Sequence, residues 1–131
     1  MASIGSVNLT INIEGANARV RVRYTLYFDD FDRRSNLPYT ENCYIYGDDT
    51  NVGDTLAGGD DSIPRGTIAI TTVTANGSSS ISRDYTKLYS RHELDEDSWP
   101  NNPDDIRARV ILTPQLPVAR KKDSNLVQYS F

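Results

Sequence analysis

Apolar and polar residues alternate with a period of two along most of the chain. The strongest alternation fills residues 7–13 and 19–28, on either side of the turn sequence Glu14-Gly15-Ala16-Asn17. Because successive side chains of a strand point to opposite faces, each segment is predicted to be a strand with one buried face. We expect the two to pair as a long antiparallel hairpin, with Arg19, Arg21 and Arg23 on its solvated face.

Five more segments have the composition of strands. Asn76-Gly77, the strongest short signal for a hairpin turn, separates two of them. The side chains predicted to reach the core are Val22, Leu26, Val110 and Leu112. The five predicted strands are residues 40–46, 67–74, 79–90, 106–113 and 125–131.

Three connections between these strands are rich in Asp, Gly, Asn and Pro: residues 29–38, 47–66 and 93–105. Each is predicted to be a loop, since no stretch of useful length has the periodicity of a helix. The connection 47–66 is unusually long for a compact domain, and such loops are often functional.

The chain of 131 residues is predicted to form a single domain over residues 1–131. Its pattern predicts an all-β fold, a two-sheet antiparallel β-sandwich of about seven strands. The strand order is similar to that of immunoglobulin-like or fibronectin-III-like sandwiches. A jelly roll or another Greek-key topology gives the same pattern. The Cys–Trp–Cys framework of immunoglobulin domains is absent, because Cys43 is the only cysteine and Trp99 lies in a predicted loop.

The net charge of −4 argues against generic binding to nucleic acid or to an anionic membrane surface. The chain shown contains no pattern of a signal peptide, and no apolar stretch approaches the ~20 residues of a membrane-spanning helix. These features leave the cellular compartment open.

Catalytic signatures are not evident. His92 is the only histidine, and no nucleophile-elbow motif accompanies it, so it is predicted to lie on the surface. Cys43 falls in the middle of a predicted strand, where a buried and inert thiol is expected. The two together cannot form a structural zinc site. An enzyme is therefore not expected, and a hydrolase that uses loop carboxylates ranks third among the functions.

Acidic residues are concentrated in two regions. Nine of the 18 lie in residues 29–61, and six lie in residues 93–105. If successive strands alternate in direction, the turn at Glu14 and the connections 47–66 and 93–105 share one end of the sandwich. Residues 29–38, the Asn76-Gly77 turn and residues 114–124 then share the other end. The first end is strongly acidic, and the second is mildly basic.

This charge distribution allows a calcium site at the acidic end. Clustered carboxylates and the carbonyl groups of glycine-rich loops are suitable ligands for Ca²⁺. The segment 49–54 partly imitates the start of an EF-hand loop, although no bidentate Glu follows at the right place. A solubilising acidic loop is the alternative. The candidate ligands are Asp49, Asn51, Asp54, Asp60 and Asp61.

The same distribution also allows head-to-tail association, in which the acidic end of one copy meets the basic end of another. Such contacts produce rings or filaments. Tyr27, Tyr44 and Tyr46 could add an exposed aromatic patch for a protein or a sugar. The candidate contact residues are Arg120, Lys121 and Lys122 on one side, and Asp95, Glu96 and Asp97 on the other.

Two functions from different classes follow from these observations. The first is a non-catalytic interaction or structural module, including a subunit of a homo-oligomeric assembly. The alternative is a Ca²⁺-dependent domain that binds carbohydrate or protein. Self-association or a protein partner is expected in the first case, and bound calcium in the second.

Overall fold

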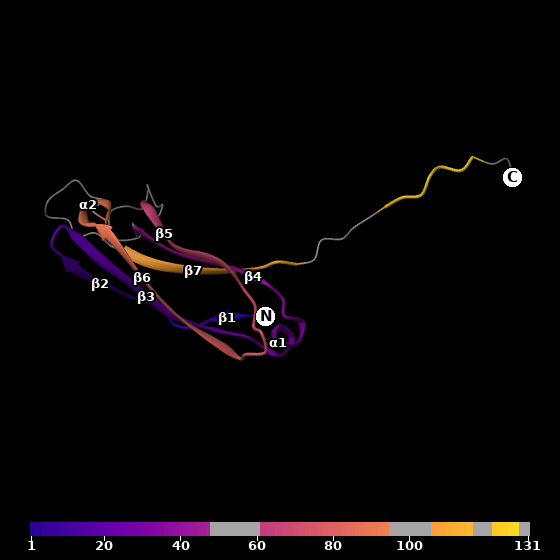
Figure 1. Ribbon diagram of the computed structural model, residues 1–131, viewed down its shortest axis with the longest axis horizontal. Helices are drawn as coiled ribbons and strands as arrows, with labels where there is room; N and C mark the ends of the chain where they lie inside the picture. The colour runs from indigo at the N-terminus through magenta and orange to yellow at the C-terminus, as the bar shows by residue number, and fades with distance from the viewer. Residues whose placement is uncertain (48–60, 95–105, 117–121, 129–131) are drawn as a thin grey trace, which may run out of the picture.

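The computed structural model describes residues 1–47, 61–94, 106–116 and 122–128. Within these ranges the chain forms two antiparallel β-sheets that pack face to face, with two short helices (Figure 1). The all-β, two-sheet prediction is therefore confirmed. In chain order the elements are β1 (Ser3–Ile4), β2 (Asn8–Glu14), β3 (Asn17–Tyr27), α1 (Asp30–Ser35), β4 (Tyr39–Gly47), β5 (Asp61–Val73), β6 (Ser80–Ser90), α2 (Arg91–Leu94) and β7 (Ile106–Pro114).

The first sheet is built around β3. Strands β1 and β2 lie one after the other along one side of β3, and β6 pairs along its other side. The register of β2 and β3 ends with Glu14 opposite Asn17, so the predicted hairpin is confirmed. Its tight turn begins at Gly15, whose φ is 62°. This left-handed backbone conformation has little energetic cost for glycine, because glycine has no Cβ.

The second sheet is built around β4, which pairs with β5 on one side and β7 on the other. Alternate side chains of β4 are buried against the first sheet, and they include Glu41, Cys43 and Ile45. Tyr44 and Tyr46 therefore face outward. Together with the alternate buried residues of β3, from Ala18 to Leu26, these side chains form the centre of the core.

The Asn76-Gly77 turn forms as predicted, with both residues at positive φ (49° and 80°). The hairpin that it predicts does not form, because β5 pairs with β4 whereas β6 pairs with β3. The turn thus leads from one sheet to the other. A turn sequence fixes only the local reversal of the chain, and the burial of each strand's apolar face decides its partner.

The prediction that residues 29–38 form a loop is wrong for residues 30–35, which form helix α1. Asp29 and Asp32 cap its start reciprocally, since each side chain accepts a hydrogen bond from the backbone of the other. Asn36, at φ 51°, ends the helix in the left-handed conformation. The helix is too short to show a 3.6-residue pattern in the sequence. A second short helix, α2, begins at Arg91, and its last two residues fall in the predicted connection 93–105.

The predicted connection 47–66 is also too long, because residues 61–66 belong to β5. Among the described strands β5 pairs only with β4, so the missing N–H of Pro64 can face away from the ladder. The register shifts between Tyr44 and Tyr46. Here Gly66 packs so closely that an added Cβ would lie 2.6 Å from the Ile45 carbonyl oxygen.

The predicted strand at residues 125–131 is wrong over residues 125–128, which pair with no described strand. Residues 129–131 lie outside the described residues. Strand β1, which pairs with the end of β3, is absent from the predicted set. The other predicted strands are confirmed with shifted ends.

Candidate functional site

The predicted calcium ligands are not tested by the described residues. Asp49, Asn51, Asp54 and Asp60 lie outside them, and Asp61 is the first residue of β5. Within the described part of the chain, no group of three or more histidine, cysteine or acidic side chains could hold a metal ion. The calcium site stays a prediction.

Most of the predicted contact residues also lie outside the described ranges, namely Asp95, Glu96, Asp97, Arg120 and Lys121. Lys122 is described and exposed. From β2 to β7, successive strands alternate in direction, as predicted, whereas β1 runs in the same direction as β2. The β2–β3 turn, the end of β4 and helix α2 lie at one end of the molecule, and α1 lies at the other (Figure 1).

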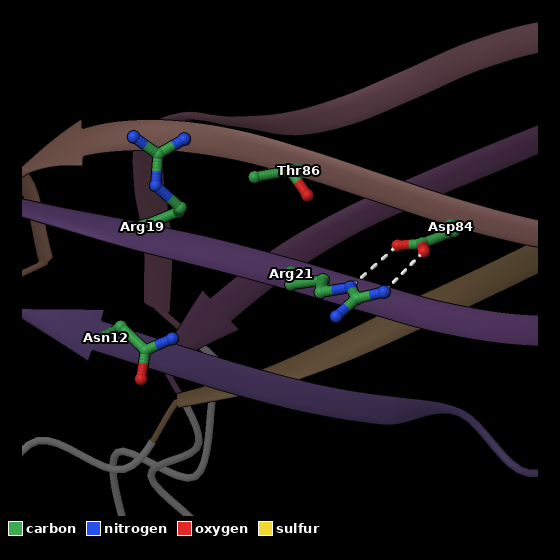
Figure 2. A pocket seen from close by; sticks show the side chains of 5 residues that line it. All are labelled: Asn12, Arg19, Arg21, Asp84 and Thr86. Carbon is green, nitrogen blue, oxygen red and sulfur yellow. Dashed lines mark hydrogen bonds and ion pairs between the residues drawn. The ribbon is translucent and has the colours of Figure 1, made fainter.

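A polar depression of about 530 Å³ lies on the outer face of the first sheet (Figure 2). Arg21 binds Asp84 through two hydrogen bonds of 2.9 and 2.6 Å, and Arg19 binds Glu14 at 2.9 and 3.1 Å. Hydrogen bonds from these arginines lower the pKa of Asp84 and of Glu14. Since these charges are paired with their neighbours, the depression resembles a solvated sheet face, as the sequence predicts for the three arginines.

A charged group missed by the sequence analysis lies in the core. Glu41 is completely buried, and its carboxylate accepts hydrogen bonds from the Arg83 guanidinium at 2.8 to 3.2 Å. It also accepts a hydrogen bond from the Tyr24 hydroxyl. Burial, together with that bond, raises the pKa of Tyr24. Because Glu41 is surrounded by donors, it functions as a structural ion pair rather than as a free acid or base.

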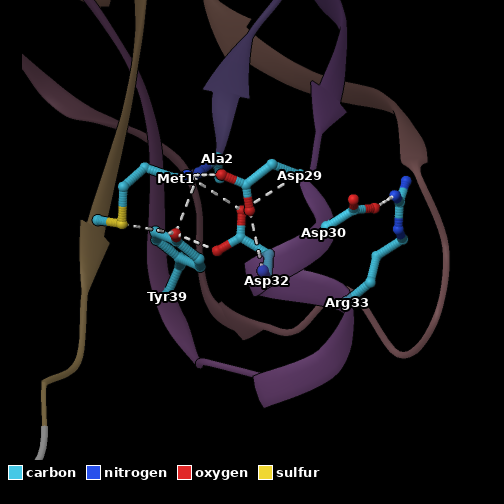
Figure 3. Close-up of polar contacts among 7 residues, drawn as sticks. All are labelled: Met1, Ala2, Asp29, Asp30, Asp32, Arg33 and Tyr39. Carbon is cyan, nitrogen blue, oxygen red and sulfur yellow. Dashed lines mark hydrogen bonds and ion pairs between the residues drawn. The ribbon is translucent and has the colours of Figure 1, made fainter.

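A second polar cluster includes residues of helix α1, at the end of the molecule opposite the β2–β3 turn (Figure 3). The buried Asp32 accepts a hydrogen bond of 2.6 Å from the Tyr39 hydroxyl, and the Met1 ammonium group binds Asp29. The hydrogen bond from this ammonium lowers the pKa of Asp29 to about 2. These contacts connect the start of the chain to α1 and β4, which is a structural role.

The three tyrosines predicted as a patch do not come together. Tyr44 and Tyr46 face outward from β4 with ring centroids 6.1 Å apart. The Arg109 guanidinium lies 4.4 Å from the Tyr46 ring centroid and donates to both hydroxyls at 3.2 Å. Tyr27 is on the outer face of the other sheet.

Among the described strands, β7 is less buried than its neighbour β4. Its side chains that face the core are only partly buried, whereas the residues opposite them on β4 are almost completely buried. Val110, for example, lies beside the fully buried Cys43. Val22 and Leu26 are buried as predicted, whereas Val110 and Leu112 are only partly buried and pack against the core. The partly buried row is Ile106, Ala108, Val110 and Leu112.

The backbone N–H and C=O groups of the residues in this row point away from β4. Gln115 N–H donates to the Pro38 carbonyl at 2.8 Å, which makes the preceding pair, Pro114 and Tyr39, a non-hydrogen-bonded pair. The register is continuous, so every second residue back from Pro114 has the same orientation. The N–H and C=O groups of Ala108, Val110 and Leu112 therefore point to the side of β7 that pairs with no described strand. We call this side the β7 edge.

The other outer edges of the sheets have features that discourage strand pairing. Strand β5 contains Pro64 and a register shift, and β6 directs the charged side chains of Arg83 and Lys87 inward. The edge formed by β1 and β2 is interrupted at residues 5–7. The inward row of β7 is apolar from Ile106 to Leu112, so the β7 edge lacks these protections.

The opposite sheet also has partly buried apolar side chains near β7. Strand β2 approaches β7 across the two sheets, and its inward side chains Leu9 and Ile11 are only partly buried. Ile13, which follows them on the same face, is 59% exposed. The name β2–β7 opening is used below for the region between the two sheets where the apolar side chains of β2 and β7 are only partly buried.

Beyond β7, the chain has apolar residues that are exposed to solvent. Residues 122–128, here called the tail segment, are exposed throughout and belong to no sheet. Leu126 is 83% exposed and Val127 is 74% exposed. In Figure 1 this segment lies well away from both sheets.

Comparisons with known proteins found no family model, no curated protein and no solved structure that matches this chain. No helix in the described ranges is long and apolar enough to cross a membrane.

Proposed function

We propose that this protein is a non-catalytic structural module that associates with other copies of itself through the β7 edge. The observation that supports the proposal most directly is the apolar inward row of β7, which is partly exposed and lies beside backbone donors and acceptors that pair with no described strand. An unprotected edge of this kind is a template for strand pairing.

The strand order supports a more specific interpretation of the fold. Among the described residues, the strand orders β2-β3-β6 and β5-β4-β7 are consistent with an immunoglobulin-like sandwich in which no strand follows β7. In such a sandwich the last strand covers the side of the second sheet that is open here. The exposed β2–β7 opening is what an unfilled position would leave.

The polar clusters favour a structural role over catalysis. Glu41 and Asp32, the buried acids of the described residues, are held by Arg83, Tyr24 and Tyr39. Each contributes to the packing of strands and lies beneath the surface.

The proposal is tested by sedimentation velocity of the full chain over a wide range of concentration. We expect reversible association, and we expect Val110→Lys to abolish it by placing a charge in the inward row. Ile70→Lys is the matched control, because Ile70 is 65% exposed on the outer face of β5. It should leave association unchanged. A wild-type chain that is monomeric at every concentration and salt level would overturn the proposal.

A further inference from the structure

We propose that the tail segment of one copy adds as a strand to the β7 edge of a second copy and fills its β2–β7 opening. The inference rests on the proposed function and names the part of the second copy that covers the edge. Addition of an extended peptide to a free sheet edge is an established mode of recognition: the backbone hydrogen bonds provide affinity, and alternate side chains provide specificity.

The alternation expected of an added strand begins in the tail segment and continues in the sequence beyond it. Apolar and polar residues alternate from Val127 to Phe131, so an extended strand there would direct Val127, Tyr129 and Phe131 to one face. The exposed Val127 belongs to that face, and an apolar row of this type matches the row that lines β7. Seven residues of extended chain span about 23 Å, which is most of the length of β7.

The direction of the chain favours a second copy over the same copy. Pro114 ends β7, and Pro117 follows it closely in the sequence. A proline fixes its own φ and restricts the preceding residue to extended conformations, so Thr113 and Leu116 are both biased against an immediate reversal. The tail segment lies beyond the sandwich (Figure 1).

The tail is also long enough to reach a neighbour. The 14 residues that follow Pro114, up to Gln128, extend to at most roughly 50 Å. Every copy then carries one donor segment and one acceptor edge. Two copies can exchange tails reciprocally, or successive copies can add to a growing chain; both use the same contact.

The test uses two single variants of the full chain and their mixture. Val127→Ser should weaken the donor, and Val110→Lys should block the acceptor, so each alone should sediment as a monomer. Mixing them should restore a one-to-one complex, because the Val110→Lys copy still has an intact tail and the Val127→Ser copy still has an intact edge. If the tail instead folds onto its own copy, the wild type will be monomeric while the mixed variants still form a complex, and the inference is overturned.

Leu126→Ser provides the matched control for the donor. Leu126 precedes Val127, so in a strand its side chain points to the opposite, solvent-facing side. We expect this variant to associate as the wild type does. Equal loss of association in both variants would indicate an unspecific apolar contact and would contradict strand addition.

Amide hydrogen exchange detects the new ladder directly. On association, exchange should slow at Ala108, Val110 and Leu112, whose N–H groups face the β7 edge, and change little at Arg109 and Ile111, which already face β4. Association without this pattern would overturn the tail-to-edge contact but leave the proposed function standing. Absence of association would end both.

Discussion

Glu41 shows how a single charged residue can be accommodated in an apolar core. Its carboxylate is completely buried, but three donors surround it: two from Arg83 and one from Tyr24. Arg83 is 24% exposed, so only one member of the ion pair loses all of its water. A buried pair of this kind contributes little net stability, but breaking it leaves a charge without a partner.

We therefore expect Glu41→Leu alone to lower the free energy of unfolding by about 3 kcal/mol. Replacing the whole group, with Arg83→Met and Tyr24→Phe added, should recover most of that loss, since no buried polar atom is left unpaired. Urea denaturation measures both. As the control, Asp84→Asn breaks the exposed pair with Arg21 and should have a much smaller effect. A triple variant that is no more stable than Glu41→Leu would contradict this account.

Cys43 and Tyr89 make stability sensitive to alkaline pH. Burial raises the pKa of the Cys43 thiol from 9.0 to about 11 and the pKa of the Tyr89 hydroxyl from 10.0 to about 12. In each case the native state holds a proton that the unfolded state loses at lower pH. The free energy of unfolding should therefore decrease from about pH 9 upward, until the native groups also ionise.

Melts at successive pH values check this sign. Cys43→Ala should flatten the decline between about pH 9 and 11, even though the variant starts from a lower stability. Tyr89→Phe should flatten it at higher pH. The prediction fails if the slopes of both variants equal that of the wild type.

At the scale of elements, the two central strands differ from the edges. Strands β3 and β4 contribute most of the fully buried residues, because each is paired on both sides and covered by the opposite sheet. Strands β2 and β7 have the same alternation of apolar residues, but within the described ranges each pairs with a neighbour on one side only. Identical patterns in the sequence therefore contribute different amounts to the free energy of unfolding.

This difference predicts unequal costs for equal substitutions. In the monomer, Leu26→Ala should destabilise by about 3 kcal/mol, since Leu26 is fully buried and leaves a cavity. Leu112→Ala should cost only about 1 kcal/mol, because its side chain is already partly in water. At concentrations where copies associate, the cost of Leu112→Ala should increase. Equal costs in the monomer would indicate that the β2–β7 opening is already covered.

At the scale of the whole molecule, charge and strand addition predict different responses to salt. The sequence places many carboxylates in the connections at one end, where their mutual repulsion is screened over ~8 Å at physiological ionic strength. The melting temperature of the monomer should therefore rise with moderate salt. A decrease would mean that attractive pairs dominate that end.

The same salt series tests how copies associate. A polar head-to-tail contact should weaken with salt and disappear when Arg120, Lys121 and Lys122 are replaced by Glu. Strand addition at the β7 edge should persist in salt, since backbone hydrogen bonds and apolar burial carry it. Sedimentation across the series distinguishes the two contacts.

The sequence by itself determined the local features of this protein. Period-two alternation identified most strands and the buried face of β3, and Gly15 and Asn76-Gly77 identified two turns. These features follow from side-chain direction and backbone φ, which a few neighbouring residues decide. Helix α1 could not be predicted in this way, because its capping contacts span only three residues and its sequence lacks an apolar period.

Tertiary structure decided which strands share a sheet and which residues have partners. The Asn76-Gly77 turn could not show that β5 and β6 belong to different sheets, and Glu41 could not be recognised as buried until Arg83, 42 residues away, came beside it. The open β7 edge was equally hidden, because its residues have the pattern of a covered strand. Whether other strands cover a given strand depends on segments that are distant in the chain. The alternation of residues within the strand does not depend on those segments and so cannot reveal them.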